Sequence, residues 1–422
     1  MEKENGFDYD NLPHNHILCI DMKAFYASVE AVDRGLDPLK AKIVVIGDKN
    51  RRGSVVLAAS PVVKEEYSIK TGNRLFQIPG TADIKIVEAR MELYLKRSLQ
   101  ITELLNQFVP LQDLHIYSVD EAWLKLDGVE RIFGDKWEIA RKIKKKLLKK
   151  YSLPCSMGIG PNMFLAKVAM DIEGKKKGLV EWTYEDVPEK LWPVQLSECW
   201  GIGTRLERRL NRIGVETVGE LAHLPEDYLE KRFGIMGTQL YNHAWGVDLS
   251  RVEGDYEPEP RNLGRGITLY SDYKSVEKIK IVIFELCEEV AKRTREHNLL
   301  GKTISLGITY SHEELAGGFR VQRTIPEYTN LIFDIYNVCL ELFRENYEGQ
   351  VVRKVQVSLG NFVTDSSFQL NLFKDKAKKV KLARVKDYIE NRYGAEAIFY
   401  GKSLKDGSIR RRIVKNIGGH KR

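Results

Sequence analysis

Cysteine is scarce in this chain of 422 residues, and the five cysteines that are present lie far apart. None of them forms a Cys-x-x-Cys pair, so neither a zinc site nor a disulfide framework is expected. Isolated cysteines of this kind are typical of buried free thiols in a reducing compartment. The sequence therefore predicts a cytoplasmic protein.

Long apolar runs and a leader segment are also missing. No stretch has the length and apolar character of a transmembrane helix, and the N-terminus, MEKENGFDYD, is polar and acidic. The 67 basic and 59 acidic residues give a formal net charge of only +8. These features predict a soluble protein of roughly two to four domains, with no membrane partner.

The pattern of strands and helices changes along the chain. Up to residue 174, short apolar strands alternate with amphipathic helices, which predicts a mixed α/β domain. Residues 175–248 read as short helices separated by glycines, and residues 249–261 are a candidate linker. Residues 262–365 follow the order strand–helix–strand–strand–helix–strand, which predicts a small sheet with two helices on one face. A basic tail, residues 366–422, ends the chain.

Three acids stand where the local pattern favours apolar residues. Asp21 ends a predicted strand, and Asp120 with Glu121 forms the tip of the strand–turn–strand segment IYSVDEAW. Taken singly, each acid is most simply an exposed strand end. Two adjacent strands could nevertheless bring all three to one edge of a sheet, with no Arg or Lys directly beside them in sequence. Buried unpaired carboxylates are costly, so this convergence indicates a divalent metal.

All-oxygen ligation is typical of Mg²⁺, and two such ions can assist an in-line phosphoryl displacement. Asp120 and Glu121 are neighbours, so in a regular strand their side chains would face opposite ways. Both can serve one site only if the SVDE turn is irregular. By this reasoning Glu121 is the weaker ligand.

Three segments, IDMKAFYASVE, YSVDEAWLKL and GIGPNMFLAKVAMD, resemble in this order the catalytic motifs of the Y-family translesion DNA polymerases. The fingers segment and the tail are most like UmuC-type lesion-bypass enzymes of Gram-positive bacteria and their phages or plasmids. The resemblance implies an α/β multi-domain, right-hand polymerase fold. Its parts would be an α/β palm (1–24 and 91–174), small fingers (25–90), a helical thumb with a helix-hairpin-helix (175–248) and an α/β little finger (262–365).

The resemblance implies roles for the residues of the first two motifs. Asp21, Asp120 and Glu121 match the catalytic acids that bind two Mg²⁺ ions, and the Met22 carbonyl matches a main-chain ligand. Tyr26 matches the steric gate, a ring that leaves no room for a ribose 2′-OH.

Phe25 and Tyr26 start a predicted helix, whose free N–H groups suit triphosphate oxygens. Without the resemblance, both rings would be read as core residues of an amphipathic helix.

Lys167 matches the family's triphosphate-binding lysine, and Asp171 lies four residues on, where it could hold Lys167 in place. By pattern alone, Lys167 would be a solvated side chain. The fingers depart from the family, because SPVVKEE replaces a common segment in which a tyrosine and an arginine contact the triphosphate. Lys64 is the candidate for the arginine's role, and Ser60 could donate a hydrogen bond to the nucleotide.

The segment CWGIGTRLERRLNRIGVETVGELA resembles a helix-hairpin-helix, which binds DNA phosphates through backbone N–H groups. An ordinary capped turn is the alternative. The residues expected to make this contact are Gly201, Gly203, Thr204 and Arg205. Arg261 and Arg265 flank the first strand of the predicted little finger and are expected to contact template phosphates.

An apolar island, QLNLF, stands alone in the basic tail. It resembles the pentapeptide through which bacterial polymerases bind the sliding clamp. Its contact residues would be Gln369, Leu370, Leu372 and Phe373. The alternative is a last strand or helix that packs on the little finger.

The leading hypothesis is a monomeric, error-prone DNA polymerase that acts on primer–template DNA and dNTPs in DNA damage tolerance and SOS mutagenesis. A polymerase-like protein that binds lesions or the clamp but has lost catalysis is the first alternative, favoured only by the altered fingers segment. Another two-metal palm enzyme, such as a nucleotide cyclase, ranks last because a helix-hairpin-helix and a little finger would be surplus to it.

Overall fold

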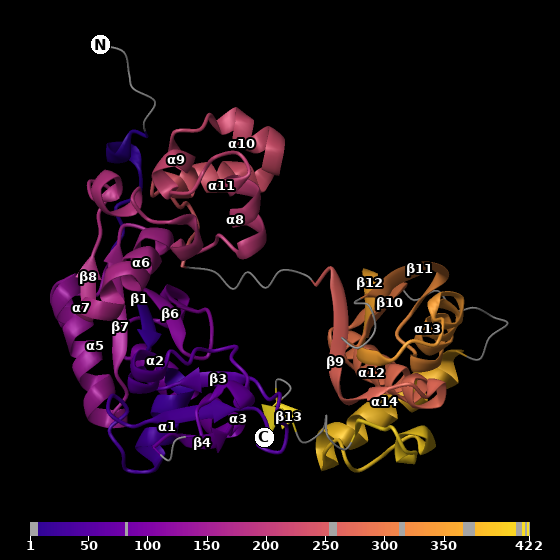
Figure 1. Cartoon of the computed structure of the whole chain (residues 1–422). Helices are drawn as coiled ribbons and strands as arrows, with labels where there is room; N and C mark the ends of the chain where they lie inside the picture. The colour runs from indigo at the N-terminus through magenta and orange to yellow at the C-terminus, as the bar shows by residue number, and fades with distance from the viewer. Residues whose placement is uncertain are drawn as a thin grey trace. The chain divides into compact units, whose positions relative to one another are not determined.

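The computed structural model describes residues 7–80, 83–252, 260–311, 317–365, 376–410, 416–417 and 420–421. The chain divides into two compact units, residues 1–256 with 420–422 (unit 1) and residues 257–419 (unit 2), and each is described by itself (Figure 1). The division falls within the segment that the sequence suggests as a linker. Among the described residues, no helix combines the length and the apolar character needed to cross a membrane.

A five-stranded sheet in the order β5-β6-β1-β7-β8 forms the centre of unit 1. β1 (Ile17–Met22) is antiparallel to both neighbours, β6 (Glu121–Lys125) and β7 (Cys155–Gly160). The edges are β5 (Leu114–Ile116) and β8 (Leu179–Glu181). Because β1 is buried among its neighbours, it reads in the sequence as a continuous apolar run that ends at Asp21.

Helices cover this sheet. α6 (Met163–Ala169) packs on β1 and β7, where Cys19 meets the side chains of Met163, Ala166 and Met170. α3 (Met91–Leu105) reaches the neighbourhood of Ile20, and α5 (Lys136–Tyr151) packs beside it. α5 is amphipathic, so its many lysines lie outward while its apolar residues join the core.

A second, three-stranded sheet in the order β3-β2-β4 lies after β1 in the chain. Its elements are β2 (Ile43–Ile46), β3 (Val56–Ala59), β4 (Lys85–Glu88) and the helices α1 (Phe25–Asp33) and α2 (Pro61–Tyr67). Ala24, between β1 and α1, has a left-handed backbone (φ 45°). This sharp turn starts α1 immediately beyond the end of β1 that carries Asp21.

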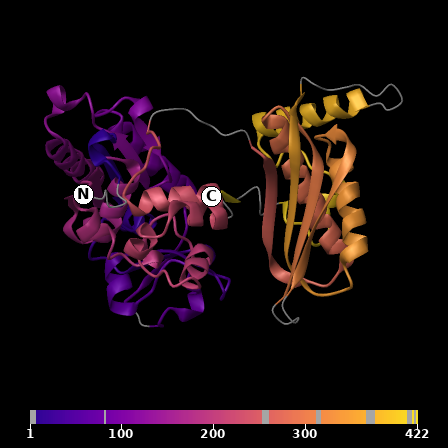
Figure 2. The same ribbon diagram turned by 90° about the horizontal axis from the view of Figure 1, so that it is seen from above.

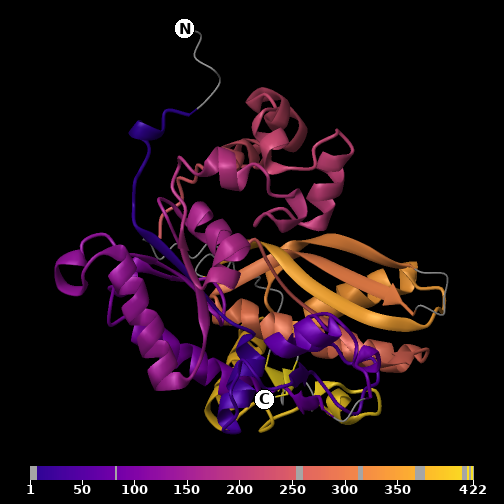
Figure 3. The same cartoon turned by 60° about the vertical axis from the view of Figure 1, so that its left-hand side comes forward.

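Four helices follow the five-stranded sheet in the chain of unit 1 and share a hydrophobic core with α6 and β8. They are α8 (Thr204–Asn211), α9 (Val218–Ala222), α10 (Glu226–Phe233) and α11 (Ile235–Ala244). Figures 1 and 3 show this cluster at one end of unit 1 and the β3-β2-β4 sheet at the other end.

Unit 2 is a four-stranded antiparallel sheet in the order β11-β10-β12-β9 (Figure 2). Its elements are β9 (Asn262–Tyr273), α12 (Val276–Glu296), β10 (Leu299–Tyr310), β11 (Gly318–Thr329), α13 (Ile332–Asn346) and β12 (Val352–Thr364). Both helices share one core with the sheet, so the predicted order and the predicted layers are confirmed. The strands place mainly small and polar residues on the other face.

Part of the predicted tail is folded. α14 (Lys376–Tyr393) packs on α12 through buried ion pairs, among them Lys386 with Glu288 at 2.5 Å and Arg295 with Asp387 at 2.6 Å. The candidate clamp motif, residues 369–373, lies outside the described residues. The remaining short elements are α4 (Glu130–Phe133), α7 (Lys175–Lys177), β13 (Asn416–Ile417) and β14 (His420–Lys421).

Candidate active site

The pairing of β1 with β6 brings the acids of two distant motifs together. Asp21, near the end of β1, lies directly opposite Glu121, the first residue of β6. The Met22 N–H donates a hydrogen bond to the Asp120 carbonyl at 3.0 Å. The antiparallel register therefore places the three predicted metal-binding acids, and Met22 beside them, at one edge of the sheet.

Asp21 is strongly perturbed at this edge. Burial, and then the neighbouring Asp120 carboxylate, raise the pKa of Asp21 to about 7, and the more weakly acting Lys175 and Lys167 do not offset them. The ionised form of Asp21 is thus disfavoured by its surroundings. A bound cation would reverse this effect.

Asp120 and Glu121 have different partners although they are adjacent. Asp120 lies in the bend before β6, where the Ser118 hydroxyl donates to its Oδ1 at 2.8 Å. Glu121 Oε1 forms an ion pair with Lys167 Nζ at 2.7 Å. The expectation that no cation accompanies the three acids is therefore wrong for Glu121, because tertiary packing supplies a lysine that is remote in sequence.

The three site acids do not close tightly around one point. Within the described ranges, the group of metal-binding side chains whose ligand atoms all lie within 4.8 Å is instead His16, Asp127 and Glu130, at the other end of β1. One of the three acids, Glu121, is paired with Lys167. The donor set at the site is all oxygen, and its excess of negative charge fits Mg²⁺.

Lys167 is held in a buried position. α6 begins at the Asn162 cap, whose side chain accepts a hydrogen bond from Leu165 N, and it leaves the Lys167 side chain only 7% exposed. Lys167 Nζ lies 3.1 Å from Asp171 Oδ2, so the contact that their spacing suggests is present. Burial alone would lower the pKa of Lys167, but the hydrogen bond to Glu121 and the charge of Asp171 outweigh burial and raise it. Lys167 therefore keeps its charge.

The Tyr26 ring stacks on Tyr94 of α3, with ring centroids 4.3 Å apart and planes 14° apart. The Tyr94 hydroxyl donates to Glu30 Oε1 at 2.8 Å, and Arg90 binds both oxygens of Glu30. Phe25 is only 2% exposed, as expected for a packing residue. Nothing in the sequence around Tyr94 distinguishes it from any other core residue of an amphipathic helix, so sequence reasoning missed it.

Lys64 lies on α2. Desolvation and then the charge of Lys175 lower the pKa of Lys64, while the charges of Asp21 and Asp120 act in the opposite direction. Both acids therefore act electrostatically on its amine. Ser60 is fully buried, and its hydroxyl accepts a hydrogen bond from Ile43 N at 3.1 Å. Its predicted nucleotide contact stays a prediction. Lys175, which pairs with Asp171 at 2.8 Å, is a second cation that sequence reasoning missed.

The predicted DNA-binding residues differ in exposure. Gly201 has a positive φ of 91°, and Gly203 precedes α8, with Thr204 and Arg205 exposed beside it. Among the described residues, and apart from each glycine and its two chain neighbours, no atom lies within 4 Å of a Cβ built on either glycine, so a phosphate could approach the backbone there.

The two predicted contacts of unit 2 also differ. Arg261 is exposed. Arg265 lies 3.3 Å from Glu289 of α12, so its charge is already paired. Its contact with template DNA stays a prediction.

Comparison with known proteins agrees with this geometry. The impB/mucB/samB family matches residues 20–171, its C-terminal domain residues 260–372, the DNA polymerase-iota thumb domain residues 200–248 and the IMS family HHH motif residues 184–215. UvrX of Bacillus subtilis is 47% identical over 98% of this chain and 99% of its own length. The chain belongs to the Y family of DNA polymerases.

Other relatives extend the same result. DNA polymerase IV 2 of Bacillus subtilis is 36% identical over 96% of this chain and 98% of its own length. DNA polymerase IV of Moorella thermoacetica is 35% identical over 93% of this chain and 97% of its own length. The predicted family of Gram-positive type is thus confirmed.

A solved Y-family DNA polymerase chimera of Dbh and Dpo4 has a TM-score of 0.66 and 22% identity, covering 83% of this chain and 99% of the chimera. At this identity the likeness concerns the fold alone. It confirms the predicted right-hand polymerase architecture.

Proposed function

We propose that the chain is a template-directed DNA polymerase of the error-prone translesion type, which adds deoxynucleotides to a primer 3′ end. The observation that carries this proposal is the meeting of Asp21 and Asp120 at one sheet edge, where burial and repulsion disfavour the ionised Asp21. We place the protein in the cytoplasm as a monomer, acting in DNA damage tolerance and SOS mutagenesis.

The residues at the sheet edge fit two Mg²⁺ ions. The carboxylates of Asp21, Asp120 and Glu121 and the Met22 carbonyl would hold them. When bound, Mg²⁺ supplies positive charge to the attacking and leaving oxygens of an in-line displacement. Asp21 would contribute in its deprotonated form, and Glu121, whose Oε1 is paired with Lys167, would be the third carboxylate available to the ions.

The nucleotide is held by residues around these acids. Lys167, once it leaves Glu121, binds triphosphate oxygens. Lys64 on α2 provides a second positive charge for the triphosphate. Phe25 begins α1, whose first N–H groups suit the triphosphate. Tyr26 lies under the sugar and excludes a 2′-OH. Ser60 is a weaker candidate for a phosphate contact.

DNA is held mainly through its phosphates. The Gly201–Gly203 turn with Thr204 and Arg205 approaches one backbone, and unit 2 contributes Arg261, with Arg265 as the weaker candidate. Binding of the bacterial sliding clamp through Gln369, Leu370, Leu372 and Phe373 is proposed from the sequence motif alone.

The altered fingers segment favours one competing function, a lesion- or clamp-binding protein without catalysis. The position of Lys64 argues against it. This lysine lies within electrostatic range of Asp21 and Asp120, where a triphosphate-binding cation is needed. Although the segment SPVVKEE lacks the family's usual tyrosine and arginine, its Lys64 still supplies a positive charge near the site.

Primer extension with Mg²⁺ on undamaged and abasic templates tests the proposal. We expect extension by the wild type and by Asp127→Asn, a control acid at the other end of β1, and none by Asp120→Asn. Failure of the wild type to extend any primer would rule out the polymerase. Equal extension by Asp120→Asn would rule out the assigned site.

A further inference from the structure

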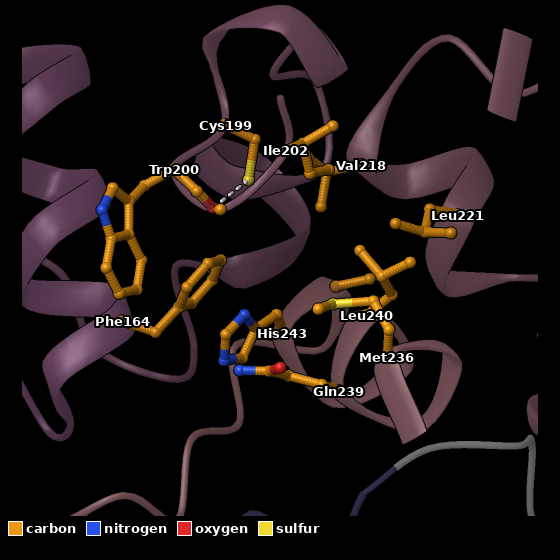
Figure 4. A pocket seen from close by; sticks show the side chains of 12 residues that line it. Phe164, Cys199, Trp200, Ile202, Val218, Leu221, Met236, Gln239, Leu240 and His243 are labelled. Carbon is orange, nitrogen blue, oxygen red and sulfur yellow. Dashed lines mark hydrogen bonds between the residues drawn. The ribbon is translucent and has the colours of Figure 1, made fainter. Parts of the chain in front are cut away.

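A cavity of about 200 Å³ lies beside the Gly201 turn in unit 1. Figure 4 shows the rings of Phe164 and Trp200 on one side of it and the branched side chains of Val218 and Leu221 on the other. The walls come from α6, from the turn itself, from α9 and from α11. No residue of the proposed catalytic centre lines this cavity.

One wall of the cavity is aromatic. The rings of Phe164 and His243 stack on each other, with centroids 4.2 Å apart and planes 21° apart, and the Trp200 ring is inclined by 27° to His243 and by 46° to Phe164. Burial lowers the pKa of His243 against the opposing charge of Asp248, so the uncharged form of its ring is favoured. A planar molecule would therefore meet an aromatic wall on one side.

The opposite wall is aliphatic. Val218 and Leu221 are each 1% exposed and Leu240 is 4% exposed, while Gln239, which also lines the cavity, is exposed. Apolar walls that face empty space lose dispersion contacts, which a ligand of the right shape would restore. Burial of an unpaired charge would be costly there, which excludes charged ligands.

The size of the cavity sets the size of the ligand. An engineered apolar cavity of about 150 Å³ in another protein stays dry and binds benzene. We propose that the larger cavity in this chain binds a neutral, planar aromatic molecule of one or two fused rings, such as indole. The exposed side chain of Gln239, which lines the cavity, can hydrogen-bond one polar atom of the ligand.

The position of the cavity links it to the function proposed above, on which this part of the inference rests. Ile202 of the turn and Phe164 of α6 both line it, and α6 also carries Lys167. A bound ring would restrain the turn before DNA arrives, so less entropy is lost when DNA binds. We expect occupancy to tighten DNA binding a few-fold.

Titration of the full-length protein with indole, followed by calorimetry and by ¹⁹F NMR of 5-fluoroindole, tests the site directly. We expect one saturable site in the wild type. Leu221→Trp should fill the cavity and weaken binding at least tenfold. Leu249→Trp, the same change at a leucine that is 65% exposed, should leave binding unchanged.

Leu221→Ala guards against misfolding of the larger variant. It should enlarge the cavity, so that naphthalene binds it more tightly than it binds the wild type, and benzoate should bind neither protein. No saturable indole binding, or equal binding by wild type and Leu221→Trp, would overturn the proposal.

DNA affinity, measured by fluorescence anisotropy with and without indole, is a separate readout. A wild type that binds indole but no DNA would refute the proposed function and leave the cavity assignment standing. Indole binding without any change in DNA affinity would refute the coupling alone.

Discussion

Two acids of the β1–α1 segment, Asp21 near the end of β1 and Glu30 within α1, behave in opposite ways. Burial and Asp120 raise the pKa of Asp21. Burial acts in the same direction on Glu30, but hydrogen bonds from Arg90, Tyr94 and Arg34 outweigh it and lower the pKa of Glu30. Glu30 is satisfied by the protein itself, whereas Asp21 lacks a sufficient counter-charge.

The contrast between Glu30 and Asp21 distinguishes acids that stabilise the fold from an acid that is available to a ligand. The Glu30 side chain is fully buried and anchors α1 to α3 through Arg90 and Tyr94. In unit 2, Glu288 and Glu390 are similarly neutralised by Lys386 and Arg410. Strongly perturbed acids are concentrated at functional sites, which makes Asp21 a candidate for charge completion by a ligand.

The largest test of the comparison removes the charge of Asp21. Asp21→Asn should abolish extension, by about a thousandfold or more, because a metal ligand is lost. The same change should stabilise the metal-free protein at pH 8 by up to about 4 kcal/mol, since the shift from 3.8 to about 7 spans about three pKa units.

The pH dependence of that stability gain has a definite sign. A raised native pKa means that the folded wild type binds more protons than the unfolded chain between pH 4 and 7. The advantage of Asp21→Asn should therefore be full above pH 7 and shrink towards zero as the pH falls to about 4. Urea unfolding of both proteins at several pH values measures it, and a constant advantage would contradict the assignment.

Glu30→Gln should have the opposite effect on stability. Removal of one partner from a buried charge network typically costs about 3 kcal/mol. The loss should be complete above the unfolded pKa of 4.5 and disappear at lower pH, because the native pKa of Glu30 is lowered. Urea unfolding provides the measurement. If Glu30→Gln instead increased stability, as is expected for Asp21→Asn, the proposed difference between the two acids would be wrong.

Lys167→Met sharpens the comparison on the catalytic side. Loss of this cation should reduce extension about tenfold or more, mainly through a higher KM for dNTP, because the triphosphate loses a partner. Lys177→Met is a matched control, since Lys177 pairs with Glu173 on the surface and is 67% exposed. Single-nucleotide kinetics would measure both, and equal effects would remove Lys167 from the nucleotide site.

The smallest expected effects concern Tyr94, which joins the Glu30 network to the proposed gate. Tyr94→Phe should keep the stack with Tyr26 and lose about 1 kcal/mol from the hydrogen bond to Glu30. Tyr94→Leu should in addition weaken discrimination against ribonucleotides a few-fold. The ratio of dNTP to rNTP incorporation reports this, and an unchanged ratio in Tyr94→Leu would limit Tyr94 to stability.

The sequence by itself determined the family, the order of the elements and the residues to examine. Local features can be recognised in the amino-acid sequence. Examples are the strand that ends at Asp21, the SVDE turn and the spacing of Lys167 and Asp171. The four strands and two covering helices of unit 2 were predictable for the same reason, because their periodicity is local.

Only the tertiary structure decided which charged and aromatic side chains contact each other. The pairing of Glu121 with Lys167, the stack of Tyr26 on Tyr94 and the packing of α14 on α12 all join segments that are remote in sequence. The pKa of a buried acid depends on which charges lie within a few ångströms of it, and sequence distance carries no such information. Asp21 and Glu30 both stand beside apolar residues in the sequence. Only in the folded chain do their pKa values shift in opposite directions, because their neighbours in space differ.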